Sequence, residues 1–234
     1  MNANNYVRVL TINFDGEIKP FEIPLFRGCV IDAMRGSADI LYHNHTEDDG
    51  FRYSYPLIQY KRIRGKAAIV CINKGADIIG QFFAEDVHHF SIGDREMDMN
   101  VEKITPQKVL VQVWDDIFKY RIRKWLALNP DNYKKYMENE SIVERTTLLE
   151  SILKGNLLSF AKGLGINIDK EIELHITGQE EPYTIQSKGV KLMAFDVEFK
   201  TNMSIPEFIG LGKNASLGYG IVTNIRDKKN ENKK

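Results

Sequence analysis

The sequence of 234 residues has little cysteine, no long apolar run and no leader-like start. Cys29 and Cys71 are too few for a disulfide framework, and their separation does not match a paired metal-ligand motif. No apolar run approaches the about 20 residues that span a bilayer. The polar N-terminus lacks the charged-then-apolar order of a signal peptide. We therefore expect a cytoplasmic protein with reduced thiols, no membrane contact, and no bound metal or cofactor.

An excess of one charge is also missing. The 32 Lys and Arg residues balance the 32 Asp and Glu residues, so the formal net charge is +0. This balance argues against a protein that binds polyanions through bulk positive charge, but it leaves room for a local basic site. The length allows one large domain or two small ones, each with a substantial core.

The first half of the sequence shows the order β-α-β-β-α-β. Apolar and polar residues alternate around Arg8, as in a half-buried strand, and Arg64-Gly65 marks a hairpin turn. Strands are expected at 6–14, 57–63, 67–72 and 89–92, and helices at 26–36 and 74–86. This order is that of the ferredoxin-like split βαβ unit, which we assign to residues 1–95.

The second half, residues 106–226, follows a polar stretch at 93–106 that we interpret as a linker. Asn129 before Pro130 predicts the N-terminus of one helix, and a capping-box pattern from Ser141 to Glu144 predicts that of the next. Strands are expected at 109–113, 171–177, 191–200 and 219–225.

These patterns predict an α+β fold of tandem ferredoxin-like (RRM-like) βαββαβ units. The second unit is degenerate, because a glycine-rich loop takes the place of its second helix. The charged residues 227–234 predict a disordered tail.

The glycine-rich segment 210–220 is the first candidate site. Glycine allows positive φ and close approach, so successive N–H groups can converge on phosphate oxygens. The segment matches neither a P-loop nor a dinucleotide fingerprint, and a plain long hairpin loop is the alternative. The candidate phosphate-binding residues are Gly210, Gly212, Lys213, Asn214, Ser216, Gly218 and Gly220.

A histidine pair, His43 and His45, is the second candidate site. In an extended backbone, side chains two residues apart project to one side. Free histidine titrates near 6.5, so a neutral and a cationic imidazole can coexist and serve as general base and general acid. Such a pair suits metal-free RNA cleavage, although an ordinary exposed loop and a metal site remain alternatives.

A basic and aromatic segment at 59–66 is the third candidate. Tyr60, Lys61 and Arg62 are candidate RNA-binding residues, because alternation would place charges on one sheet face, where they can follow a phosphate backbone. Residues 119–124 show the same mixture of basic and aromatic residues. A solvated strand face is the alternative for both segments. Tyr42 or Lys61 is a further candidate for stabilising charge on the reacting phosphate.

Together these features resemble one family. The glycine-rich loop near the C-terminus resembles the signature of the repeat-associated RNA-binding (RAMP) proteins of CRISPR systems. Phe26-Arg-Gly28, Leu41-Tyr-His-Asn-His45 and Tyr55-Pro-Leu-Ile-Gln-Tyr-Lys61 are similar to the b-type branch of the CRISPR repeat-RNA processing endoribonucleases.

The resemblance implies metal-independent cleavage of CRISPR repeat RNA into guide units, with His43 and His45 as catalytic residues. It implies that the glycine-rich loop contacts RNA or supports the site. Other CRISPR effector subunits are expected partners, and a homodimer through strand edges is compatible with the sequence. The single lysine of the loop, Lys213, and the neutral net charge depart from the basic character of many relatives.

Two alternatives stay open. A non-catalytic RNA-binding or scaffold subunit of the same superfamily would keep the glycine-rich loop without needing the histidine pair. His89-Phe-Ser-Ile92 and His175-Ile-Thr-Gly178 have the texture of two-histidine phosphoesterases, although the two motifs fall on predicted strands that are not equivalent.

Overall fold

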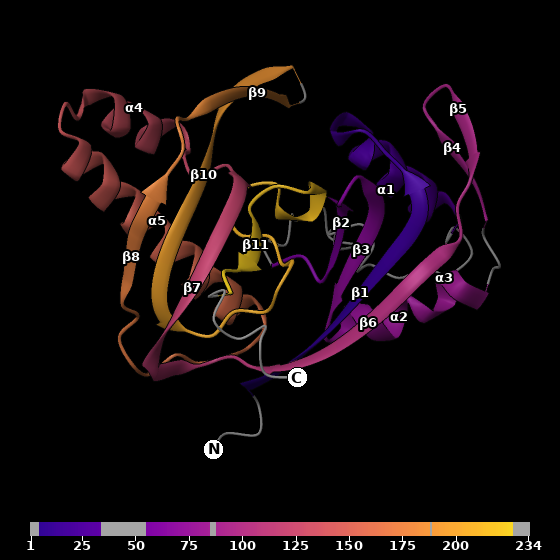
Figure 1. Cartoon of the computed structure of the whole chain (residues 1–234), viewed down its shortest axis with the longest axis horizontal. Helices are drawn as coiled ribbons and strands as arrows, with labels where there is room; N and C mark the ends of the chain where they lie inside the picture. Colours follow the sequence, from indigo (N-terminus) through magenta and orange to yellow (C-terminus); the bar gives the residue numbers. More distant parts are fainter. Residues whose placement is uncertain (1–4, 34–54, 85–87, 188, 227–234) are drawn as a thin grey trace, which may run out of the picture. The chain divides into compact units, whose positions relative to one another are not determined.

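The computed structural model describes residues 5–33, 55–84, 88–187 and 189–226 and divides the chain into two units (Figure 1). The N-terminal unit contains Tyr6–Val109 and also Ala215–Gly218, a short segment from the glycine-rich loop. The C-terminal unit consists mainly of Leu110–Asn214 and the chain from Tyr219 onward. The predicted disordered tail, residues 227–234, lies outside the described residues.

The N-terminal unit is built on a four-stranded sheet with the order β2-β3-β1-β6. Its strands are β1 (Tyr6–Glu17), β2 (Ile58–Ile63), β3 (Lys66–Ile72) and β6 (Val101–Leu110). β3 runs antiparallel to both of its neighbours, with Val9 opposite Ile72 and Tyr60 opposite Ile69. Arg64 and Gly65 both have positive φ, as the tight turn predicted between β2 and β3 requires.

Short helices connect these strands: η2 (Pro20–Glu22), α1 (Ile23–Ala33), α2 (Lys74–Ile78) and α3 (Gly80–Ala84). The helix predicted at 74–86 is therefore two short helices within its described part. The core of the unit contains a cluster of rings in which Phe14 packs edge-to-face on Phe26, Phe82 and Phe90, with centroids 5.5, 6.3 and 6.0 Å away.

Two predictions about residues 89–106 are wrong. β4 (His89–Ile92) was expected to close the main sheet, but it pairs with β5 (Arg95–Asp98) in a separate two-stranded sheet. The expected linker at 93–106 instead contains β5 and part of β6. β6 lies at the end of the strand order and is largely exposed, so its polar sequence carries no apolar alternation that would mark a strand.

The C-terminal unit contains a second antiparallel sheet with the order β11-β7-β10-β8, and β9 pairs with β10. Its strands are β7 (Val113–Trp125), β8 (Leu174–Gln179), β9 (Tyr183–Ser187), β10 (Val190–Met203) and β11 (Ile221–Asn224). β9 is not among the strands predicted from the sequence. Taken in chain order without β9, the strands lie side by side in the same sequence as those of the N-terminal sheet.

The helices of this unit are α4 (Pro130–Glu138) and α5 (Ile142–Gly163). The side chain of Asn129 accepts from the amide of Asn132 at 2.7 Å, so the predicted N-cap of α4 is formed. Ser141 occupies the N-cap of α5 without a side-chain capping bond, so the predicted capping box is not formed. Leu149, Leu153, Leu157 and Phe160 form the buried face of α5.

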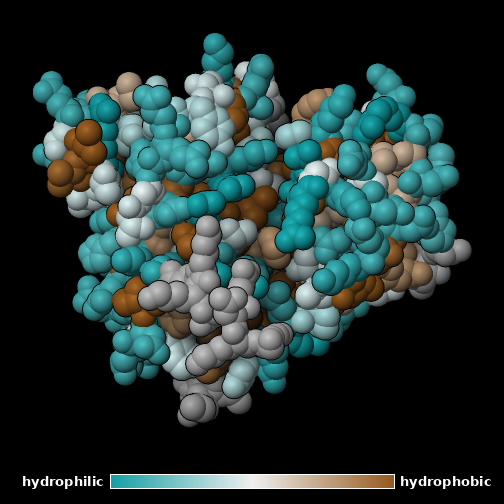
Figure 2. All heavy atoms as spheres, in the orientation of Figure 1, coloured by the Kyte–Doolittle hydropathy of each residue, from teal (hydrophilic) through white to brown (hydrophobic). Residues whose placement is uncertain are grey.

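The α+β fold class is confirmed, with antiparallel sheets throughout both units. The face of the protein drawn in Figure 2 is mainly hydrophilic, with apolar side chains gathered over α4 and the start of α5. The exposed large hydrophobic residues of α4 and the start of α5 are Tyr133, Met137, Ile142 and Val143. None of the helices in the described ranges has the length and apolar character needed to cross a membrane.

Candidate RNA-processing site

The predicted catalytic residues His43 and His45 lie in 34–54, outside the described residues. The chain between the end of α1 at Ala33 and the start of β2 at Ile58 carries them. The elements that flank this connection are described, and they place the other candidate residues of the N-terminal unit.

Tyr60 and Lys61 on β2 are almost completely buried, with exposed fractions of 1% and 0%. The Tyr60 ring packs edge-to-face on Phe26, with centroids 6.0 Å apart, and so belongs to the core of the unit. The sequence analysis treats both side chains as RNA contacts on an accessible strand face. Their burial does not support a direct contact for either residue, because a phosphate backbone can reach only exposed groups.

The ammonium of Lys61 donates a hydrogen bond to the carbonyl oxygen of Ala215, with Nζ and O 3.3 Å apart. Ala215 begins the short helix η4 (Ala215–Leu217), which contacts β2 in the N-terminal unit (Figure 1). Burial lowers the pKa of Lys61 to about 7, because a dry environment disfavours the charged form. The structure thus joins two motifs that the sequence presents 154 residues apart.

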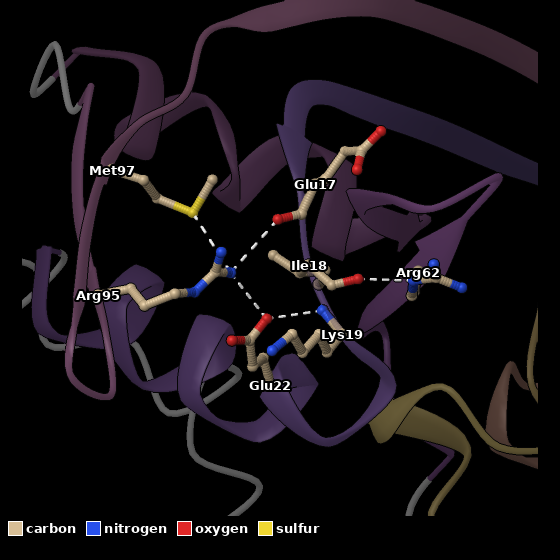
Figure 3. Close-up of polar contacts among 7 residues, drawn as sticks. All are labelled: Glu17, Ile18, Lys19, Glu22, Arg62, Arg95 and Met97. Carbon is tan, nitrogen blue, oxygen red and sulfur yellow. Dashed lines mark hydrogen bonds and ion pairs between the residues drawn. The ribbon is translucent and has the colours of Figure 1, made fainter.

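Arg62 is exposed, and its Nε donates to the carbonyl of Ile18 at 2.6 Å. Figure 3 shows this bond on one side of the β1–α1 connection and a second arginine, Arg95, on the other side. Nη2 of Arg95 contacts the carboxylate of Glu22 at 2.8 Å. Glu22 is buried and also accepts from the backbone amide of Lys19 at 2.6 Å. Both arginines therefore hold the connection between β1 and α1, and Arg62 has a structural role besides its predicted contact with RNA.

Two glycines of the loop allow close packing within the C-terminal unit. At Gly220, with φ of +61°, a Cβ would clash with the backbone of Leu211. At Gly212, with φ of +80°, a Cβ would lie 2.9 Å from Nε1 of Trp125. The Gly220 amide also donates to the carbonyl of Lys124 at 3.1 Å. These glycines are required by the fold, whatever the loop binds.

The remaining loop residues differ in accessibility. Lys213 is exposed, and Ser216 and Asn214 are half-buried. Gly210 forms a β-bridge with Ile221. Gly218 is buried in the N-terminal unit, where a Cβ would lie 2.7 Å from Cδ1 of Ile23. Lys213, Asn214 and Ser216 are thus the predicted loop residues that keep open surface for contact with a ligand.

The two histidines of the phosphoesterase alternative lie in different settings. His89 on the β4–β5 hairpin contacts Asp98 and Glu96, each at 2.8 Å, and the hydrogen bond to Asp98 raises its pKa. His175 lies on β8 of the other sheet, 3.8 Å from Glu150. β4 lies outside the main sheet of the N-terminal unit, whereas β8 is the end strand of the main sheet of the C-terminal unit. The two histidines therefore do not occupy equivalent strands.

Comparisons with known proteins match both units. Residues 5–109 match the family model of the Cas6b N-terminal domain, and residues 112–225 match that of the Cas6b C-terminal domain. An uncharacterized protein of Methanocaldococcus jannaschii is 34% identical over 116 residues, which is 49% of this chain and 78% of that protein.

Solved structures agree. A crystal structure of Cas6b has a TM-score of 0.84 and 25% identity, covering 94% of this chain and 100% of its own. A crystal structure of the CRISPR RNA processing endoribonuclease Cas6b has a TM-score of 0.72 and 23% identity, with the same coverage. The fold is that of the Cas6 class of CRISPR-associated proteins. Within this class, the chain belongs to the Cas6b family, which confirms the resemblance drawn from the sequence.

Proposed function

We propose that this protein cleaves CRISPR repeat RNA within precursor transcripts to release guide RNAs. The observation that carries the proposal is the match of both units, in order, to the two domains of one RNA-processing family. The chain adds a histidine pair, His43 and His45, in the connection between α1 and β2.

The proposed reaction needs no metal. One imidazole takes the proton of a ribose 2′-hydroxyl, whose oxygen attacks the adjacent phosphorus. The bond to the 5′-oxygen breaks, and the second imidazole protonates that leaving oxygen. The products are a 2′,3′-cyclic phosphate and a 5′-hydroxyl. The assignment of base and acid between His43 and His45 stays open.

The predicted RNA-binding residues that keep open surface are Arg62 and Ser216 in the N-terminal unit, and Lys213 and Asn214 in the C-terminal unit. Gly210, Gly212, Gly218 and Gly220 shape the loop that carries three of them. Association with other CRISPR effector subunits, or with a second copy of the chain, remains a prediction.

The test is cleavage of labelled repeat RNA by the purified protein. We expect His43→Ala and His45→Ala each to lower the cleavage rate by about 10²–10⁴-fold while RNA affinity changes little, because a general acid or base acts in the transition state. His175→Ala, an exposed histidine on β8, is the matched control and should cleave at the wild-type rate.

Chelation with EDTA should leave the rate unchanged, and a 2′-deoxy substitution at the cut site should block cleavage. Loss of activity with EDTA would contradict the metal-free mechanism. If His175→Ala and His89→Ala abolish activity while His43→Ala and His45→Ala do not, the phosphoesterase alternative is correct. Tight binding of repeat RNA without any cleavage would favour the scaffold alternative.

A further inference from the structure

The side chain of Lys61 is completely buried, whereas that of the next residue, Arg62, is exposed. An ammonium group taken out of water loses its hydration, so this placement costs free energy that an apolar side chain of similar length would avoid. Packing alone therefore gives no reason for a lysine here. The hydrogen bond to Ala215 gives one, because an apolar residue cannot make it.

The acceptor of this bond belongs to a segment that packs closely on the N-terminal unit. Ala215–Gly218 is part of that unit, and η4 contacts both β2 and α1. At Gly218, a Cβ would lie 2.7 Å from the Ile23 side chain and 3.6 Å from the Tyr60 carbonyl oxygen. The segment therefore lies against the two elements that the histidine-bearing connection joins.

A direct contact between Lys61 and RNA does not fit this geometry. The side chain has no exposed surface, and its amino group points to a backbone carbonyl. Lys61 can therefore affect RNA binding only through the segment Ala215–Gly218, to which it is hydrogen-bonded. Ser216, one residue beyond the bound carbonyl, is half-buried and keeps part of its surface open.

We propose that Lys61 is a positioning residue, which holds Ala215–Gly218 against β2 and the start of α1 and so presents Ser216 to the RNA. The effect on RNA rests on the function proposed above. The hydrogen bond fixes one conformation of the segment before RNA arrives. Without this hydrogen bond, Ala215–Gly218 is docked in only a fraction of the molecules, and the apparent affinity for RNA falls in proportion to that fraction.

The first test compares Lys61→Met with the wild type. We expect the variant at pH 7 to be at least as stable as the wild type, because it removes an amino group that loses its hydration on burial, yet to bind repeat RNA about tenfold more weakly. A purely structural role would lower stability and affinity together. Lys61→Arg keeps a charged donor and should recover part of the affinity. Lys191→Met, which removes an exposed lysine from β10, controls for net charge.

The second test needs no RNA. Hydrogen exchange of the 215–218 amides in the free protein should be about tenfold faster in Lys61→Met than in the wild type and unchanged in Lys191→Met. Unchanged exchange in Lys61→Met overturns the proposal, and so does faster exchange with wild-type RNA affinity. If the wild type does not bind repeat RNA, the proposed function fails, while exchange still decides whether Lys61 holds the segment.

Gly218→Ala keeps the proposal testable if Lys61→Met does not fold. It loosens the same segment from its other side, so it should increase exchange at 215–218 and weaken RNA binding without touching the lysine. Wild-type RNA affinity in a Gly218→Ala protein with faster exchange overturns the proposal. Where both variants fold, their effects on RNA binding should be less than additive, because they act on one docked state.

Discussion

At the scale of single residues, the buried amine of Lys61 links stability to pH. Its pKa is lowered from 10.5 to about 7 in the folded protein by burial. Between pH 7 and pH 10.5 the amine of Lys61 is protonated in the unfolded chain and neutral in the native protein. The free energy of unfolding therefore rises with pH across this range. This gain in the free energy of unfolding is lost as the pH falls from 10.5 toward 7. Below pH 7, Lys61 is protonated in both the native and the unfolded protein.

We therefore expect the free energy of unfolding of the wild type to increase, relative to that of Lys61→Met, as the pH rises from 7 to 9. The limiting slope is about 1.4 kcal/mol per pH unit for one proton. Denaturant unfolding of both proteins at several pH values measures it. A difference between them that is independent of pH would show that Lys61 titrates alike in the folded and unfolded states.

The identity of residue 61 alone could not predict the positioning role that we propose for Lys61. Lys61 lies in a strand between Tyr60 and Arg62, and such a mixture of basic and aromatic residues is typical of a solvated face. Burial of the side chain depends on Ala215, a residue far away in the sequence whose small apolar side chain gives no signal of its contact. Gly220 is predicted to bind RNA, and the structure shows that its close contact with the backbone of Leu211 already requires a glycine.

At the scale of elements, the connection from β1 into α1 depends on the pair formed by Glu22 and Arg95. The Glu22 side chain is 5% exposed and that of Arg95 is 45% exposed, so loss of the arginine would leave a buried carboxylate short of a partner. α1 precedes the connection that carries the proposed catalytic residues His43 and His45.

We expect Arg95→Met to lower the free energy of unfolding by about 1–3 kcal/mol. Arg8→Met is the matched control, since it breaks an ion pair with Asp77 in which both side chains are 57% exposed, and it should cost less than about 1 kcal/mol. Urea denaturation measures both. Equal losses in the two variants would mean that the Glu22 pair contributes no more than a surface ion pair.

Most elements of the fold follow from local patterns. The β2–β3 hairpin follows from Arg64-Gly65, because a two-residue turn needs positive φ at both positions. The start of α4 follows from Asn129, which caps it. β6 could not be predicted, since an exposed edge strand needs hydrogen bonds from its neighbour but no apolar residues of its own.

At the scale of the whole molecule, the chain crosses between its two units within the glycine-rich loop. Gly218 belongs to the N-terminal unit, whereas Gly220, two residues later, belongs to the C-terminal unit. Substitutions at these neighbouring glycines should therefore disturb different units.

We expect Gly218→Ala to increase hydrogen exchange in β2 and α1, which η4 contacts, and to leave β7 and β11 unchanged. Gly220→Ala should do the reverse, because Gly220 is bonded to the backbone of Lys124 and Leu211. Hydrogen exchange with mass spectrometry resolves these peptides. The same pattern of exchange in both variants would contradict the division of the loop between the units.

The α+β class, the approximate positions of most strands and the family can be predicted from the sequence, because these depend on short-range periodicity, turn chemistry and the order of motifs. Tertiary structure alone decided that β4 leaves the main sheet, that Tyr60 and Lys61 are buried, and that Ala215–Gly218 belongs to the N-terminal unit. Each of these depends on which distant segment covers a given surface, and contact across 154 residues leaves no local pattern at either end.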